Sequence, residues 1–214
     1  MKKWIVPSVM IGAAIIVSLF SYERLPEQIP IHWDLNGNMD NYAPKALALS
    51  FVPGIMLLIL IIDKWIPLIE PKRGNMKKNR KDVTRIYMTT LLVLLIVHIL
   101  TIGYGLGYEL NMSNAAPVIV GALCVVAGNV LPRLKSNFTA GIRTPWTLAH
   151  EQVWRRTQRL SGRLFFFGGI VMMLSFLLPS TIRNVIMIVV IGAIILIPTL
   201  ISYLLYRKEG RTNM

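Results

Sequence analysis

Long apolar stretches alternate with shorter polar segments along the whole chain. Six apolar stretches run at about 4–22, 46–66, 86–107, 115–132, 164–180 and 184–206. A helix needs roughly 20 mainly apolar residues to cross a bilayer. The pattern therefore predicts an all-α membrane protein with six transmembrane helices.

Composition supports this class of protein. Hydrophobic residues make up 54% of the chain and charged residues only 15%, whereas soluble domains carry about 25% charged residues. The single cysteine, Cys124, lies inside an apolar stretch, so no intrachain disulfide can form and one thiol makes no metal site. We expect it to be a small buried hydrophobic residue.

The basic residues predict the orientation in the membrane. All of the 23 Lys and Arg residues except Arg24, Lys45 and Arg183 lie in four groups: before the first stretch, from Lys64 at the end of the second stretch to Arg85, between the fourth and fifth stretches, and after the sixth. Because Lys and Arg are enriched in cytoplasmic loops, both termini are expected to be cytoplasmic. The net charge of +13 then serves orientation and contact with the lipid bilayer, and no direct nucleic-acid partner is expected.

This topology divides the chain into three parts. Residues 1–66 form an N-terminal two-helix unit with an extracytoplasmic loop at 23–45. Residues 67–85 form a basic cytoplasmic loop, and residues 86–214 form a four-helix unit with a motif loop at 132–163. The two long loops therefore face opposite sides of the membrane.

The predicted spans hold little that could carry chemistry. No charged residue falls near the middle of a span, which argues against a proton-coupled transporter. His98 is expected to be a neutral histidine that bonds to a neighbouring helix. The chain has no nucleophilic Ser–His or Cys–His set, no HExxH and no phosphate-binding glycine loop. We therefore expect no enzyme and no cofactor. A transporter or channel for a small molecule or lipid is the alternative, with polar residues at His98, Thr101, Asn129 and Ser175.

The outer segment "LPEQIPIHWDLNGNMDNYAPK" predicts a small hairpin. Its prolines prevent a continuous helix, "IPIHW" can form a strand, and Asn36-Gly37 is a strong tight-turn signal. Asp34 and Asp40 are expected to stabilise turns. A metal site at His32, Asp34 and Asp40 is the alternative, although the segment lacks the second His or the Cys that would make it specific.

The inner segment "GIRTPWTLAHEQVWRRTQRLSG" predicts an amphipathic loop helix. Thr144 can cap a helix that starts at Pro145, and Gly162 can end it before the fifth span. One helical face carries Trp146, Ala149, Val153, Thr157 and Leu160, and the other carries Arg155, Arg156, Arg159 and Arg163.

Such a helix is either an interfacial anchor or a docking surface for a cytosolic partner. Arg143 could bond the carbonyl end of the fourth helix or a lipid phosphate. We hypothesise that Arg143 and Trp146 make specific polar bonds that shape this loop.

Two longer patterns resemble a known family. "GNVLPRLKSNFTAGIRTPWTLAHEQVWRRTQRLSGR" resembles the signature of the SdpI family of bacterial membrane immunity proteins, with the core "GIRTPWTL" followed by "VW..T.R..G". The outer segment resembles the domain that often precedes it, with the pattern "LP..IP.HW...G..D....K". Together the two patterns extend the resemblance over nearly the whole chain.

The resemblance implies immunity to a secreted, membrane-active peptide toxin that is met on the outer side. In some relatives it also implies recruitment of a small cytosolic DNA-binding repressor. The inner residues that match the pattern, and that we expect to bind a partner, are Gly141, Arg143, Thr144, Pro145, Trp146, Thr147, Trp154, Thr157, Arg159 and Gly162. The matching outer residues are Pro30, His32, Trp33, Gly37, Asp40 and Lys45.

Overall fold

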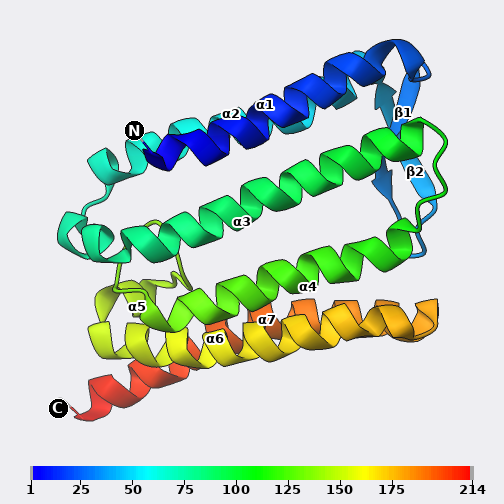
Figure 1. Ribbon diagram of the computed structural model, residues 1–214. Helices are drawn as coiled ribbons and strands as arrows, with labels where there is room; N and C mark the ends of the chain where they lie inside the picture. The colour runs from blue at the N-terminus through cyan, green and yellow to red at the C-terminus, as the bar shows by residue number, and fades with distance from the viewer. Residues whose placement is uncertain (1, 213–214) are drawn as a thin grey trace. The chain divides into compact units, whose positions relative to one another are not determined.

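The computed structural model describes residues 2–212, with the side chains of 4–209, and contains six helices long and apolar enough to cross a membrane (Figure 1). These six helices confirm the predicted all-α membrane fold. They are α1 (Lys2–Ser21), α2 (Lys45–Ile69), α3 (Arg73–Gly105), α4 (Met112–Val130), α6 (Glu151–Leu174) and α7 (Ser180–Thr212). The shorter elements are β1 (Gln28–Trp33), β2 (Met39–Pro44), α5 (Pro145–Ala149) and the 3-10 turns η1 (Tyr22–Arg24), η2 (Leu131–Arg133) and η3 (Ser175–Leu177).

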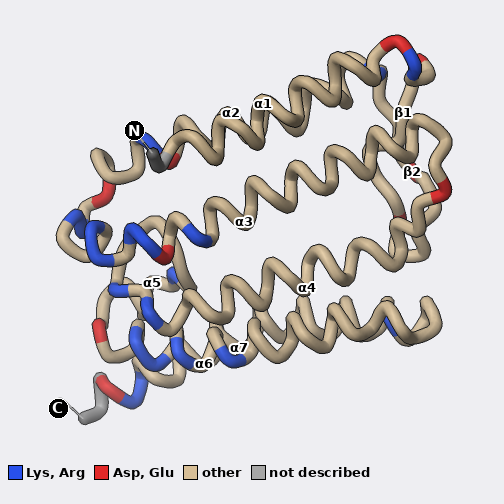
Figure 2. The backbone as a smooth tube through the Cα atoms, viewed as in Figure 1, with Lys and Arg blue, Asp and Glu red and all other residues tan. Residues whose placement is uncertain are grey.

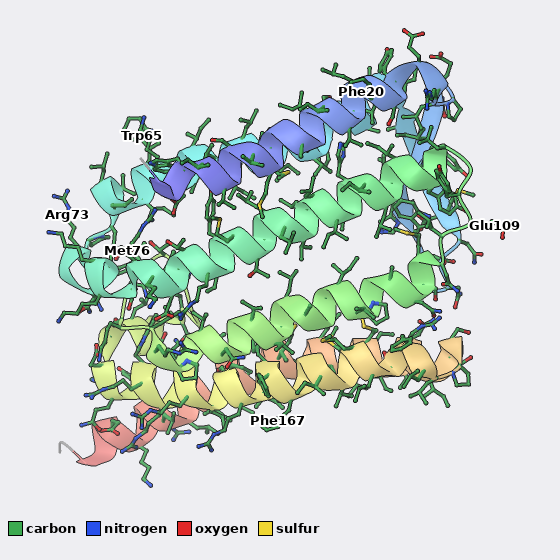
Figure 3. The ribbon with its side chains drawn as sticks, in the orientation of Figure 1. Phe20, Trp65, Arg73, Met76, Glu109 and Phe167 are labelled. Atoms are coloured by element: carbon green, nitrogen blue, oxygen red, sulfur yellow. The ribbon has the colours of Figure 1, made fainter. Side chains whose placement is uncertain are left out.

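Large apolar side chains cover the outer faces of the long helices. Phe20, Trp65 and Phe167 project away from their helices (Figure 3) and are 79%, 55% and 63% exposed. A soluble protein rarely exposes so much contiguous apolar surface, whereas lipid tails are as apolar as these side chains. The exposed faces therefore fit a bilayer, and the chain is a multi-pass membrane protein.

The contacts group the chain into two compact units. Met1–Lys64 with Met88–Ala116 form the first unit, and Trp65–Tyr87 with Pro117–Met214 form the second. This grouping differs from the sequence division at residues 66 and 85. The reason is that α3 is one helix whose first turns pack in the second unit and whose later turns pack in the first.

The first unit carries the predicted hairpin. Strands β1 and β2 pair antiparallel, with Ile29 opposite Ala43, and Gly37 turns the chain at φ +86°. Ile29 is fully buried in a core with Leu25, Ala48 and Ile102. The hairpin is therefore fixed to its helices by a hydrophobic core and is not a free loop.

Within the same unit, His98 of α3 lies 2.8 Å from the hydroxyl of Ser18 of α1. The imidazole is 1% exposed. This bond to a neighbouring helix confirms the structural role expected for His98.

Glycines bring α4 and α6 into close contact in the second unit. A Cβ added at Gly121 would lie 2.6 Å from the Gly169 carbonyl, and one at Gly128 would lie 2.7 Å from the Gly162 carbonyl. The two glycines of α4 are seven residues apart, and so are the two glycines of α6. The two contacts therefore lie two helical turns apart. Small residues allow such an approach in membranes, where van der Waals packing is a main source of helix association.

Two expectations about helix ends were wrong. Residues 73–85, expected within a basic loop, are the first turns of α3. The inner amphipathic helix does not end at Gly162, because α5 stops at Ala149 and α6 runs unbroken from Glu151 into the fifth span. Apolar periodicity marks where a helix enters lipid but not where a polar extension begins.

The basic side chains of the second unit gather at one end of its helices. Figure 2 shows the blue backbone of Lys and Arg residues along the start of α3, along the start of α6 and at the end of α7. Arg183 instead lies near the start of α7. This distribution agrees with the charge pattern of the sequence. The side chains of Lys2, Lys3 and Arg211, which that pattern also uses, lie outside the described residues.

Candidate functional site

Residues 134–144 connect η2, which follows α4, to α5, and they contain the start of the core "GIRTPWTL". Asn79 of α3 binds the backbone of this loop twice: its amide nitrogen donates to the Lys135 carbonyl at 2.8 Å, and its oxygen accepts from the Lys135 N–H at 2.8 Å. Asn79 is 2% exposed. The Asn79 side chain therefore makes the two hydrogen bonds that a neighbouring strand would otherwise make with this backbone.

A buried carboxylate holds the next part of the loop. Glu70, between α2 and α3, accepts from the Phe138 N–H at 3.0 Å and from the Thr139 hydroxyl at 2.6 Å. Burial by itself raises the pKa of Glu70, but the hydrogen bonds from Thr139, Phe138 and Lys72 outweigh it and hold the pKa below its ordinary value. Glu70 is thus an anion that orders the loop.

Lys72 and Asn137 make further hydrogen bonds to this loop. The Lys72 ammonium donates to the Ser136 hydroxyl at 2.5 Å and lies over the Phe138 ring. Asn137 is fully buried, and its side-chain oxygen accepts from the Thr139 and Ala140 N–H groups. Side chains therefore bind several backbone groups of a loop that has no regular structure.

Arg143 makes one of the polar bonds that we hypothesised. Its guanidinium donates to the Phe138 carbonyl, five residues earlier in the loop, rather than to the end of α4. The side chain is otherwise exposed. Arg143 therefore closes the loop on itself and still presents charge at the surface.

Gly141 and Gln158 lock the end of the loop against α6. Gly141 has φ +110°, and a Cβ there would lie 3.0 Å from the Gln158 side-chain oxygen. Gln158 is fully buried, accepts from the Ile142 N–H at 3.0 Å and donates to the Ile142 carbonyl at 2.9 Å. Only glycine adopts this backbone angle without strain and also fits in the small space beside Gln158.

Thr144 begins α5 as predicted. Its hydroxyl accepts from the Thr147 N–H, the Thr147 hydroxyl accepts from the Thr144 N–H, and Pro145 follows at the first helical position. The Thr144 hydroxyl also donates to Ser202 of α7 at 3.0 Å. The cap therefore ties α5 to α7.

The two tryptophans of the motif have different roles, which corrects our hypothesis for Trp146. Trp146 packs its ring against Tyr203 of α7, with the centroids 5.1 Å apart. Trp154 is fully buried, and its indole N–H donates to the Leu134 carbonyl at 2.7 Å. Trp154 thus makes the specific polar bond that we expected of Trp146.

The start of α6 has one buried face and one basic face. Trp154, Thr157 and Gly162 are buried, and a Cβ at Gly162 would lie 2.5 Å from the Pro132 ring. The exposed face carries Arg155, Arg156, Arg159 and Arg163. The inner motif residues therefore form one rigid structure, and the arginines of α6 and Arg143 are its exposed charges.

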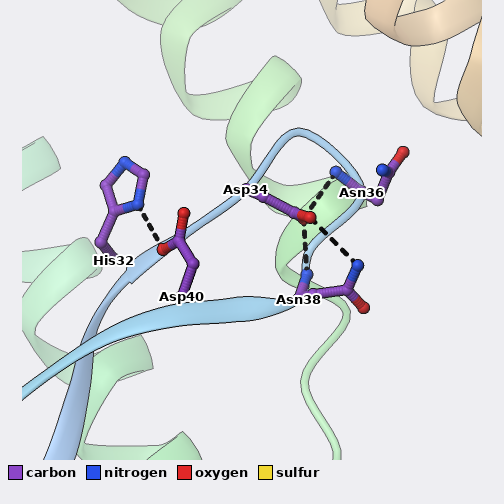
Figure 4. A network of polar contacts seen from close by, with 5 residues as sticks. All are labelled: His32, Asp34, Asn36, Asn38 and Asp40. Atoms are coloured by element: carbon purple, nitrogen blue, oxygen red, sulfur yellow. Dashed lines mark hydrogen bonds and ion pairs between the residues drawn. The ribbon is translucent and has the colours of Figure 1, made fainter.

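The outer residues form a second cluster on the hairpin. The His32 imidazole lies 2.6 Å from the Asp40 carboxylate (Figure 4), and the Trp33 ring packs edge-on against Tyr104 of α3. Lys45 donates to the Leu25 carbonyl and pairs with Glu27 at 3.1 Å. Pro30 is buried on β1.

Asp34 stabilises the hairpin turn as expected. Its carboxylate accepts from the N–H groups of Asn36 and Asn38 (Figure 4), and the hydrogen bonds from Asn38 are the main reason that its pKa is lowered. Asp40 instead pairs with His32 across the strands, so the turn role expected for Asp40 was wrong. Among the described residues, no three His, Cys, Asp or Glu side chains are placed to hold a metal ion.

Sequence reasoning missed Glu70, Lys72, Asn79 and Gln158, all of which hold the loop. A signal was present for Glu70, because it is the only acidic residue between Lys64 and Lys81. Polar residues next to a basic run are usually solvated, so their burial followed only from the folded chain.

The chain is a multi-pass cell-membrane protein with six membrane helices. Each unit has one specialised loop: the hairpin in the first unit and, in the second, residues 134–144, which we call the braced loop. The chain belongs to the SdpI family. It is 30% identical over 213 residues to the immunity protein SdpI of Bacillus subtilis strain 168, which covers 97% of this chain and 98% of that protein.

Two family descriptions match separate parts of the chain. The SdpI/YfhL protein family matches residues 133–202, and a domain of unknown function, DUF1648, matches residues 9–57. No solved structure matches the chain. The two families cover the braced loop and the hairpin respectively, which confirms the resemblance seen in the sequence.

Proposed function

We propose that this chain protects its cell from a secreted, membrane-active peptide toxin. The observation that carries the proposal is the similarity to an immunity protein over nearly the full length of both chains. In this proposal the hairpin faces outward, where the toxin arrives, and the braced loop faces the cytoplasm, as the basic residues indicate.

The experiment is a survival assay in a sensitive strain that lacks its own immunity protein. Peptide toxins purified from culture supernatants of the source organism and of Bacillus subtilis are the challenge. Expression of the chain should raise tolerance to one of these toxins and leave tolerance to detergent unchanged. Unchanged killing by every toxin, with the protein confirmed in the membrane, would remove the proposal.

Orientation is tested with reporter fusions. A fusion after residue 40 should report the outer side, and fusions at residues 76, 150 and 212 should report the cytoplasm. A cytoplasmic signal at residue 40 would exchange the proposed roles of the two loops.

The braced loop supports a second step, the docking of a small cytosolic DNA-binding repressor. Its backbone is held by buried Glu70, Asn79 and Gln158, and an anchor would not need such precise bracing. Arg155 and Arg159 provide exposed positive charge on the adjoining helix.

The test uses a fluorescently tagged small DNA-binding protein from the neighbouring genes as the candidate repressor. The double variant Arg155→Gln, Arg159→Gln should release it from the membrane after exposure to toxin. Lys77→Ala removes an exposed charge from α3 and is the matched control. Equal membrane recruitment in both variants would contradict docking at this loop and would leave it the role of a membrane anchor.

A further inference from the structure

A cavity of about 620 Å³ opens beside the tip of the hairpin, within the first unit. Its walls are Asn36 and Gly37 of the hairpin turn, Tyr104 near the end of α3, and the connection from Gly107 to Met112. Nothing in the proposed function assigns this cavity a ligand.

The walls are fixed in place. Gly37 lies so close to the first turn of α4 that an added Cβ would be 2.8 Å from the Ser113 Cβ. On the other side, α3 ends in hydrogen bonds from the Gly107 N–H to the Tyr104 carbonyl at 3.0 Å and from the Tyr108 N–H to the Gly103 carbonyl at 3.1 Å. This is a Schellman ending, in which Gly107 adopts φ +90°.

The lining suits a cation. Tyr104 and Tyr108 contribute aromatic rings, whose faces attract ammonium and guanidinium groups. Trp33 holds the Tyr104 ring at a centroid distance of 5.8 Å. Glu109 contributes an exposed carboxylate (Figure 3), and the negative end of the α3 dipole lies at the same place.

The surface around the cavity is also negatively charged. The outer segment 25–45 and the α3–α4 connection together contain four acidic residues, Glu27, Asp34, Asp40 and Glu109, and one basic residue, Lys45. Lys45 already pairs with Glu27. A surface with excess negative charge draws cationic partners towards it.

The geometry points to this cavity as the site that receives a lysine or arginine side chain of the peptide toxin. The inference rests on the proposed function for the identity of the peptide, and on the cavity alone for the chemistry of the bound group. The ring of Tyr108 is exposed and is available to an incoming side chain, whereas Tyr104 forms the fixed wall.

The binding experiment uses the full chain, with 3-fluorotyrosine at its seven tyrosines, in dodecyl maltoside, which contains no amine. Tyr104→Phe and Tyr108→Phe assign the two resonances in the fluorine NMR spectrum. The probes are Nα-acetyl-lysine methylamide, Nα-acetyl-arginine methylamide and the neutral norleucine analogue. Both cationic probes should shift the two resonances saturably, and the neutral probe should not.

Glu109→Gln should weaken binding of the cationic probes about two- to fivefold, the range for an exposed ion pair. Glu23→Gln removes an exposed acid outside the cavity and should leave it unchanged. Equal shifts from the neutral probe, or no saturable shift from any probe, would overturn the site.

A survival assay separates this inference from the proposed function. Glu109→Gln and Tyr108→Leu should reduce protection at normal membrane abundance, while Glu23→Gln should not. If the parent protects and both cavity variants protect equally well, the site is wrong and the function stands. If the parent fails to protect but the cationic probes bind, the cation site stands without the toxin.

Discussion

Replacing Trp154 by phenylalanine tests the bracing of the inner loop most directly. The substitution keeps an aromatic ring but removes the indole N–H, which donates to the Leu134 carbonyl at 2.7 Å. Trp154 is fully buried and Leu134 is 3% exposed. Water therefore cannot replace the lost donor without a rearrangement of the loop.

The magnitude follows from two losses. A buried carbonyl left without its donor costs about 1–3 kcal/mol. The smaller ring leaves a space of about 40 Å³, which costs about 1 kcal/mol at roughly 24 cal/mol per Å³. The expected loss in the free energy of unfolding is therefore about 2–4 kcal/mol.

The matched control is Trp146→Phe in the same motif. Trp146 is partly exposed and packs its ring against Tyr203, a contact that phenylalanine largely keeps, so its loss should stay below about 1 kcal/mol. Unfolding is measured by circular dichroism in mixtures of SDS and dodecyl maltoside. Equal losses for the two variants, or a loss below about 1 kcal/mol for Trp154→Phe, would refute the reasoning.

Two further predictions concern the bracing carboxylate and the glycine contact. Because the pKa of folded Glu70 lies below its ordinary value, its contribution to stability is present above the unfolded pKa of about 4.3 and is lost as pH falls through the folded value. In the Glu70→Gln variant the melting temperature should therefore fall less steeply below about pH 4.5 than in the parent. The same dependence on pH in both proteins would contradict this. Gly128→Ala places a Cβ 2.5 Å from the Phe166 nitrogen and should lower the melting temperature measured on a fluorescent-protein fusion. Gly12→Ala, which meets no atom within 4 Å, should leave it unchanged or slightly raised, and equal effects would show that close packing is not the cause.

Short-range patterns in the sequence determined much of this protein by themselves. Six apolar stretches set the number of spans, because a bilayer sets the length of a helix that crosses it. Asn36-Gly37 determined the hairpin turn, and Thr144-Pro145 determined the start of α5, because each depends on only a few neighbouring residues. These features needed no knowledge of which helices pack together.

Tertiary structure alone decided how the candidate sites are held. Glu70 and Phe138 are 68 residues apart in sequence, and Asn79 and Lys135 are 56 residues apart. Neither bond leaves a periodic signal. Trp146 and Trp154 look alike in the motif, yet only the fold buries the Trp154 indole against the Leu134 carbonyl. The outer cavity likewise forms between the Gly37 turn and the α3–α4 connection, which lie far apart in the sequence. Such contacts depend on long-range packing, so local sequence patterns carry too little information to predict them.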